Sequence, residues 1–140
     1  MRTTIVQVYS RRAALLGAMT LLIGALACDE VPSSPGSEPE IANETDSFAY
    51  QVTGVRSYSG SDFYTWENTG ATASVDISSA PESGSALIVM TDAEGQHVFA
   101  EPVSSNGSLP SAAGTAGSWT IRVYYASFTG NVNFRVQKKT

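Results

Sequence analysis

The 140-residue sequence contains only one cysteine, Cys28, and one histidine, His97. A single cysteine cannot form an intramolecular disulfide, so no disulfide framework holds the chain. One cysteine and one histidine also fall short of the three or four ligands that a zinc site takes. A catalytic triad needs a base beside its nucleophile, and no serine here lies in a Gly-x-Ser-x-Gly motif. We therefore expect no catalytic residues, no cofactor and no metal.

Basic residues are also scarce, with 8 Lys and Arg against 13 Asp and Glu. Residues 28–140 keep all 13 acidic side chains and five of the basic ones, so their net charge is −8. Proteins that bind nucleic acid neutralise phosphates with Lys and Arg, so we expect no nucleic-acid partner. In the later part of the chain the acids are scattered singly, without the Asp-x-Asp spacing of a calcium loop; they are Asp62, Glu67, Asp76, Asp92 and Glu94. We expect Asp92 to cap a turn, and the acidic excess to favour solubility.

A long hydrophobic run is missing too. The apolar segment near the start, Ala13–Ala27, has 15 residues, whereas a membrane-spanning helix needs about 20. Arg2, Arg11 and Arg12 precede this segment, and Cys28 follows it directly. A basic head, a short apolar stretch and small residues before a cleavage site are typical of a secretory signal peptide. We expect residues 1–27 to form a signal helix that is cleaved.

The end of this segment, Ala25-Leu26-Ala27-Cys28, resembles the lipobox of bacterial lipoproteins. In that family the cysteine is acylated and becomes the new N-terminus. The resemblance implies lipidation at Cys28 and a place in the cell envelope, on the periplasmic or extracellular side of a membrane. Several acyl chains hold a protein to a membrane far more stably than one chain does. The alternative is an ordinary signal peptide, in which case Cys28 is an unmodified cysteine.

The segment that follows is rich in proline and acidic residues. It contains Pro32, Pro35 and Pro39, and it has no aromatic side chain. Such a composition buries too little apolar surface to offset the entropy lost on ordering. We expect the acylated cysteine and a flexible acidic linker over residues 28–45. Residues 46–140 are then long enough for one domain with one modest core.

In that domain, apolar and polar residues alternate with a period of two, which predicts β-strands. The alternating segments are residues 48–52, 73–77, 119–125 and 132–136. Ala86–Met90 is continuously apolar, as is typical of a covered central strand. Strands with one buried face need a second sheet to cover that face. We predict an all-β fold, an antiparallel β-sandwich of about seven strands with a jelly-roll or immunoglobulin-like arrangement.

Three segments mark the connections between these strands. Asp92–Gly95 and Phe128–Asn131 each contain a glycine that can close a short hairpin. Pro102–Gly117 is rich in Ser, Gly and Ala, and we expect it to cross between the sheets. The last two predicted strands, Gly117–Val123 and Gly130–Val136, resemble the closing hairpin of bacterial pre-peptidase C-terminal-type β-sandwich domains. That resemblance implies a non-catalytic module, because such domains usually accompany secreted enzymes without catalysing a reaction.

Aromatic side chains are numerous for so small a domain. Because neighbours along a strand point to opposite sides, Tyr124 faces outward if Tyr125 is buried, and the same holds for one of Phe63 and Tyr64. Outward rings can stack on sugars or anchor a protein partner. The candidate ligand face consists of Tyr58, Tyr64, Tyr124 and Phe128. The alternative is that these rings only fill and cover the core.

The sequence thus predicts a lipid-anchored, non-catalytic protein of the bacterial cell envelope. It would contact the membrane through the lipid on Cys28 and bind an envelope protein or a glycan through its candidate face. Two alternatives remain open at this stage. One is a small envelope hydrolase that depends on a single carboxylate or on His97. The other is a purely structural subunit of a larger envelope complex.

Overall fold

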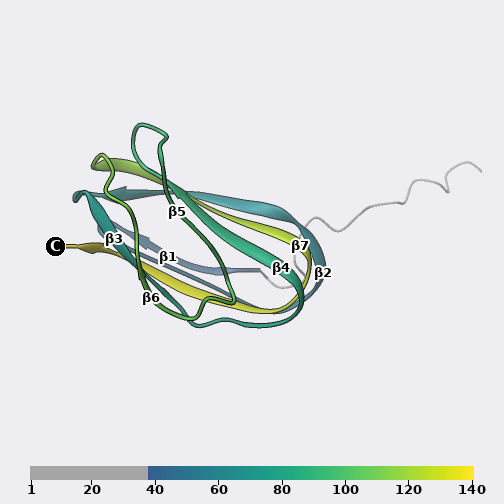
Figure 1. The fold of residues 1–140 in the computed structure, drawn as a ribbon. Coiled ribbons are helices and arrows are strands. Elements are labelled where there is room, and N and C mark those ends of the chain that lie inside the picture. The colour runs from purple at the N-terminus through teal and green to yellow at the C-terminus, as the bar shows by residue number, and fades with distance from the viewer. Residues whose placement is uncertain (1–37) are drawn as a thin grey trace, which may run out of the picture. The chain divides into compact units, whose positions relative to one another are not determined.

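The computed structural model describes residues 38–140, which form seven antiparallel β-strands (Figure 1). The strands are β1 (Glu40–Glu44), β2 (Ser47–Asn68), β3 (Thr72–Ile77), β4 (Ala80–Thr91), β5 (His97–Pro102), β6 (Gly107–Pro110) and β7 (Gly117–Lys139). The predicted all-β, antiparallel fold is confirmed. Within residues 38–140, no helix is long and apolar enough to cross a membrane. The expected signal helix and the expected lipidation site at Cys28 lie outside the described residues.

The two longest strands, β2 and β7, each belong to both layers of the sandwich. Residues 47–52 of β2 pair with 132–137 of β7, and residues 60–68 pair with 117–125. Register shifts between Val52 and Gly60 mark the bend in β2, because irregular pairing of this kind bends a strand and increases its twist. Figure 1 shows β2, β4 and β7 curving together at one end of the domain. One continuous sheet is therefore folded over itself.

The bend divides the sheet into two layers. The first layer has the order β2 (60–68), β7 (117–125), β4 and β5. The second layer has the order β1, β2 (47–52), β7 (132–137), β3 and β6. The core lies between them and includes Trp66 and Trp119, both fully buried, whose rings meet edge to face with centroids 5.9 Å apart. The side chains predicted to alternate inward along β2, β3 and β7 are buried there.

At Phe128–Asn131 the structure differs from the prediction of a hairpin turn. Gly117–Lys139 is one strand, so the segment that resembled a closing hairpin is a bent strand instead. Gly130 has a φ of +139°, and a Cβ there would lie 2.5 Å from the carbonyl oxygen of Ala80. Glycine is therefore needed for the close approach of β4 at the bend, not for a turn.

The other two predicted connections are observed. Asp92–Gly95 forms the turn between β4 and β5, with Gly95 at a φ of +85° and its N–H 3.0 Å from the carbonyl oxygen of Asp92. Pro102–Gly117 leaves the first layer and contains β6, which pairs with β3 in the second layer. This segment therefore crosses between the layers as predicted.

The ordered domain begins before the predicted boundary at residue 46. β1 lies within the expected linker, yet it pairs with β2 along its whole length, from Glu40 opposite Gln51 to Glu44 opposite Ser47. All five residues of β1 are exposed. Backbone hydrogen bonds rather than burial hold this strand, so composition could not reveal it. The linker prediction is wrong for residues 40–44, and its part before residue 38 lies outside the described residues.

Candidate binding face

The structure separates the four residues of the predicted ligand face. Phe128 is fully buried and Tyr58 is 9% exposed; they are register partners inside the bend. Tyr64 is partly buried and turns its ring inward, with its centroid 5.5 Å from that of Phe48. Only Tyr124 lies on an outer face, with 42% of its surface exposed. The prediction of an outward face is therefore wrong for Tyr58, Tyr64 and Phe128.

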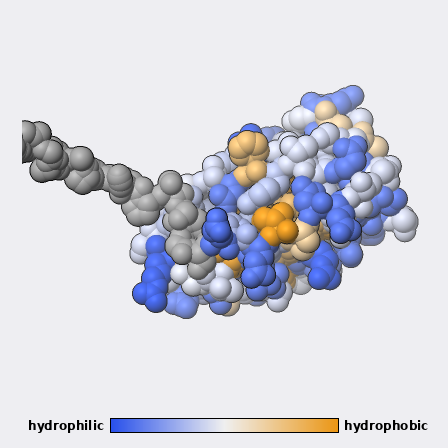
Figure 2. Space-filling view, turned by 180° about the vertical axis from the view of Figure 1, so that it is seen from behind, coloured by the Kyte–Doolittle hydropathy of each residue, from blue (hydrophilic) through white to orange (hydrophobic). Residues whose placement is uncertain are grey.

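Exposed hydrophobic side chains gather instead around Tyr124. In the described part of the chain, four large hydrophobic residues are exposed: Phe63 by 63%, Tyr124 by 42%, and Ile41 and Leu87 by 37% each. Phe63, Leu87 and Tyr124 all lie on the outer side of the first layer. The view in Figure 2 shows a largely hydrophilic surface on which hydrophobic residues appear in small groups. Three of the four exposed large hydrophobic residues therefore share one sheet face.

Two neighbouring rows of the first layer place these side chains together. Tyr124 on β7 is opposite Leu87 on β4, and Arg122 lies between Phe63 on β2 and Val89 on β4. Because Phe63 is the diagonal neighbour of Tyr124 across the strands, their backbones are separated by about 7–8 Å. We call Phe63, Leu87, Val89, Arg122 and Tyr124 the aromatic face.

Arg122 is the charged residue of the aromatic face. Its guanidinium carbon lies 5.3 Å from the centre of the Phe63 ring, within the range of a cation–π interaction. The single ion pair found in residues 38–140 joins Lys138 and Asp46, so it does not involve Arg122. The guanidinium therefore offers N–H donors to a ligand.

Phe63 also lies on an edge of the first layer, because residues 60–68 of β2 pair only with β7. Part of this edge is covered by β1: the Asn43 side-chain amide donates to the carbonyl of Thr65 at 2.9 Å, and the Trp66 indole donates to that of Glu44 at 3.1 Å. Phe63 precedes these covered residues. Its ring is therefore open to a partner both from the face and from the edge.

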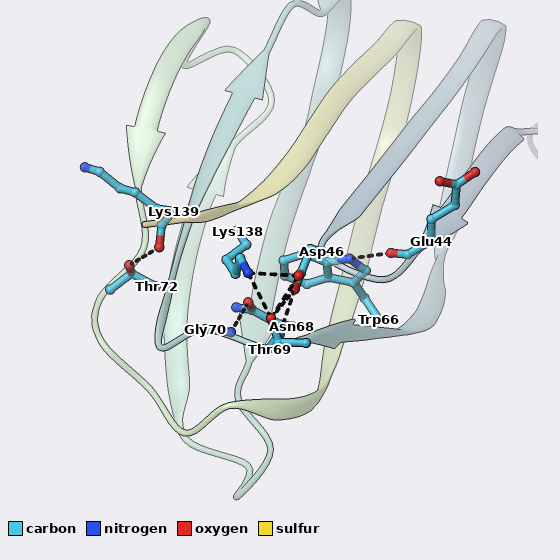
Figure 3. Close-up of polar contacts among 9 residues, drawn as sticks. All are labelled: Glu44, Asp46, Trp66, Asn68, Thr69, Gly70, Thr72, Lys138 and Lys139. Carbon is cyan, nitrogen blue, oxygen red and sulfur yellow. Dashed lines mark hydrogen bonds and ion pairs between the residues drawn. The ribbon is translucent and has the colours of Figure 1, made fainter.

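Apart from the aromatic face, a polar cluster of Asp46, Thr69 and Lys138 joins the ends of the strands (Figure 3). One carboxylate oxygen of Asp46 accepts a hydrogen bond from the Thr69 backbone at 2.7 Å, and the other lies 3.0 Å from the Lys138 ammonium, which also donates to the Thr69 hydroxyl. The Thr69 backbone N–H, and to a lesser extent Lys138, lower the pKa of Asp46. These groups satisfy one another, so the cluster links the β1–β2 turn to β7 and is not an open site.

Two further residues named from the sequence, His97 and Asp92, lie at the two ends of the β4–β5 connection. His97 is exposed at the start of β5. Among residues 38–140, no three His, Cys, Asp or Glu side chains gather where they could hold a metal ion. Asp92 caps the β4–β5 turn, accepting hydrogen bonds from the backbone of Glu94 and Gln96, as predicted.

Comparison with protein-family models and with curated proteins finds no match to this chain. The aromatic face is therefore defined by the geometry of the domain itself. Sequence reasoning missed Phe63, although the position of Trp66 carries the necessary signal. Trp66 is three residues from Phe63 and two from Tyr64, so a buried Trp66 places Tyr64 inside and Phe63 outside.

Proposed function

We propose that this protein is a non-catalytic module of the bacterial cell envelope, anchored by a lipid on Cys28, that binds another envelope protein through the aromatic face. One observation carries the proposal: three of the four exposed large hydrophobic residues in the described domain lie on the same sheet face, around Arg122. On a monomeric protein, exposed hydrophobic residues are usually scattered singly. Tyr, Phe and Arg are enriched at the centres of protein interfaces.

A protein partner fits this face better than a glycan does. A sugar stacks on an open aromatic ring, whereas the guanidinium of Arg122 already lies over the ring of Phe63. The same guanidinium can donate hydrogen bonds to carbonyl or carboxylate groups of a partner. Leu87 and Tyr124 add apolar contact area beside it. A glycan remains the alternative ligand for this face and would have to displace Arg122 from the ring.

A lipid anchor suits such a module, because two molecules held at one membrane meet at a high effective concentration. Moderate affinity at the aromatic face is then sufficient for association. If the protein were instead a small envelope hydrolase, it would show an activity that replacing His97 or one carboxylate abolishes. A purely structural role predicts no dependence on the aromatic face.

Photo-crosslinking in cells tests the proposal. A crosslinking amino acid at Ser61 samples the aromatic face, since Ser61 is opposite Tyr124 on the outer side of the first layer. The same amino acid at Gln137, an exposed residue of the second layer, is the control. We expect one discrete adduct from position 61 and none from position 137. The adduct should weaken in Cys28→Ala, which removes the anchor.

Replacements within the aromatic face complete the test. Tyr124→Ala and Arg122→Ala should each abolish the adduct, and they should change the free energy of unfolding by only about 0.5 kcal/mol because both residues are exposed. Arg56→Ala removes a different exposed arginine and should leave the adduct intact. Equal crosslinking from positions 61 and 137, or an adduct that survives both replacements, would contradict the proposal.

A further inference from the structure

The outer face of the second layer carries a hollow that the aromatic face does not share. Its volume is about 510 Å³, and β1, β2, β3 and β7 all contribute to its lining. This volume is within the range of pockets that bind small organic ligands. The polar side chains of the lining are Glu40, Gln51, Asp76, Ser78, Asn133 and Arg135. We call this hollow the polar groove.

The groove exists because two neighbouring strands carry alanine at facing positions. Ala42 on β1 is opposite Ala49 on β2, and Ala49 is opposite Arg135 on β7. Two methyl groups therefore stand beside a long guanidinium side chain, which leaves space above the alanines. Asp76 continues this row on β3, opposite Arg135. Two short side chains therefore lie beside longer ones across the outer face, and the difference in length forms a groove.

The polar groups of the groove both donate and accept hydrogen bonds. Arg135 provides guanidinium donors and takes no part in the ion pair found within residues 38–140. Asp76 accepts a hydrogen bond from the Ser108 hydroxyl and has further acceptor sites. Gln51 and Asn133 are opposite each other on β2 and β7, so two side-chain amides lie next to each other. Each amide offers a carbonyl oxygen and two N–H donors.

We propose that the polar groove binds a neutral saccharide chain. A saccharide hydroxyl both donates and accepts, which matches the amides, and adjacent hydroxyls match the paired groups of Arg135 and Asp76. Glu40 and Asp76 oppose a strongly anionic ligand, because they add two negative charges to the one positive charge of Arg135. The methyl groups of Ala42 and Ala49 provide a flat apolar strip for the C–H face of a sugar ring. This site is independent of the protein-binding role proposed for the aromatic face.

Nuclear magnetic resonance of the isotope-labelled full-length protein tests this proposal. The probes are three neutral tetrasaccharides, cellotetraose, chitotetraose and mannotetraose, each added at millimolar concentration. We expect at least one of them to shift the side-chain amide signals of Gln51 and Asn133 and the guanidinium signal of Arg135. Loss of one charged hydrogen-bonding partner should weaken that binding at least tenfold in Arg135→Ala.

Two further variants separate binding from folding. Ala49→Leu fills the hollow while leaving every polar group in place, and it should abolish the shifts with the melting temperature retained. Arg56→Ala removes an exposed arginine outside the groove and should leave the binding unchanged. The proposal is overturned if none of the three saccharides shifts the groove signals, or if the shifts persist in both Arg135→Ala and Ala49→Leu. Shifts confined to Phe63 and Tyr124 would also overturn it and would make the aromatic face the glycan site.

Discussion

The hydroxyl oxygens of Tyr50 and Tyr125 lie 2.5 Å apart, and this contact joins the two layers of the sandwich. Tyr50 also donates a hydrogen bond to a carboxylate oxygen of Asp62 at 2.9 Å. A phenol has one proton to donate, so Tyr125 must be the donor to Tyr50. The result is a directed chain from Tyr125 through Tyr50 to Asp62. Both tyrosines are buried, so water cannot readily replace either partner.

This chain predicts unequal effects for two conservative replacements. Tyr125→Phe removes only the first link of this chain, the hydrogen bond to Tyr50, so we expect the free energy of unfolding to fall by about 1 kcal/mol. Tyr50→Phe deprives both Tyr125 and Asp62 of a partner, so we expect a loss of about 2–3 kcal/mol. Urea unfolding monitored by tryptophan fluorescence measures both values. Tyr124→Phe, which removes an exposed hydroxyl, is the matched control and should change little. Equal losses for the two buried positions would contradict the directed chain.

The same tyrosines predict a loss of stability at high pH. Burial is the main cause that raises the pKa of Tyr50 and Tyr125 above the ordinary value of 10.0, and the neighbouring phenol and Asp62 raise that of Tyr50 further. Above pH 10 the unfolded chain releases these protons while the folded chain keeps them. The stability contributed by the protonated phenols is therefore fully present below pH 10. The free energy of unfolding then falls as the pH rises, by about 1.4 kcal/mol per pH unit for each such tyrosine.

Urea unfolding at a series of alkaline pH values measures this slope. Tyr58 and Tyr64 also have a raised pKa, so Tyr50→Phe removes one of several groups and its slope should be shallower than that of the unchanged protein without vanishing. Tyr124→Phe should keep the original slope. A free energy of unfolding that stays constant above pH 10 would show that the two phenols ionise equally well in the folded state.

Much of the core could be predicted from the sequence, because period-two alternation is a local signal. Phe48, Tyr50 and Val52 alternate with polar neighbours, and all three are buried in the structure. The same is true of Trp119 and Ile121 on β7. Each of these segments is straight, so the alternation along the strand assigns every residue to the correct face of the sheet. The predicted sandwich follows from the need to cover these faces.

The alternation fails where a strand bends. Register shifts between Val52 and Gly60 interrupt the alternation, so Val55 is buried while its neighbours Gly54 and Arg56 are exposed. Phe128–Asn131 has the composition of a turn, and only the close approach of Ala80 to Gly130 shows that it is a bend. Both departures arise from contacts between strands that are distant in the sequence. The edge strand β1 was missed for a related reason, since its order depends on pairing with β2.

The hydrogen bonds of Asp92 predict that the folded protein loses stability in acid. One of its carboxylate oxygens accepts the backbone N–H groups of Glu94 at 2.9 Å and Gln96 at 2.8 Å, and the other accepts that of Thr115 at 2.8 Å. These hydrogen bonds, that from Thr115 foremost, lower the pKa of Asp92 below 3.8. The stability that the Asp92 carboxylate contributes to the folded protein is therefore fully present above the pKa of the unfolded chain. It is lost as the pH falls through the pKa of the folded chain.

Asp92→Asn turns one accepting oxygen into a donor that faces other donors, so the melting temperature at neutral pH should fall. The dependence of stability on acid should also become weaker, because the shifted carboxyl group is gone. Glu94→Gln makes the same chemical change at an exposed neighbour in the turn and should have little effect. Thermal unfolding at neutral and acidic pH compares the three proteins. Equal melting temperatures for both variants would exclude a special role for Asp92.

Gly84 and Gly95 separate the cost of backbone conformation from the cost of close packing. Both have a positive φ, of +72° and +85°. A Cβ at Gly84 would lie 2.0 Å from the carbonyl oxygen of Ser127, whereas nothing lies within 4 Å of one at Gly95. Gly95→Ala should therefore cost about 1–2 kcal/mol for the left-handed conformation alone. Gly84→Ala must also push β4 away from β7, so we expect a larger loss, of about 3 kcal/mol or more.

The Gly84 replacement should reach the aromatic face as well. Three residues beyond Gly84, Leu87 is opposite Tyr124, so a displacement of β4 at the bend separates two members of that face. We expect Gly84→Ala to weaken the crosslink from position 61 under conditions where the variant remains folded, and Gly95→Ala to leave it unchanged. Denaturant unfolding and the crosslinking assay together measure both effects. If Gly84→Ala lowered stability but kept the full adduct, the partner would not depend on the pairing of Leu87 with Tyr124, and the binding face would have to centre on Phe63 and Arg122 alone.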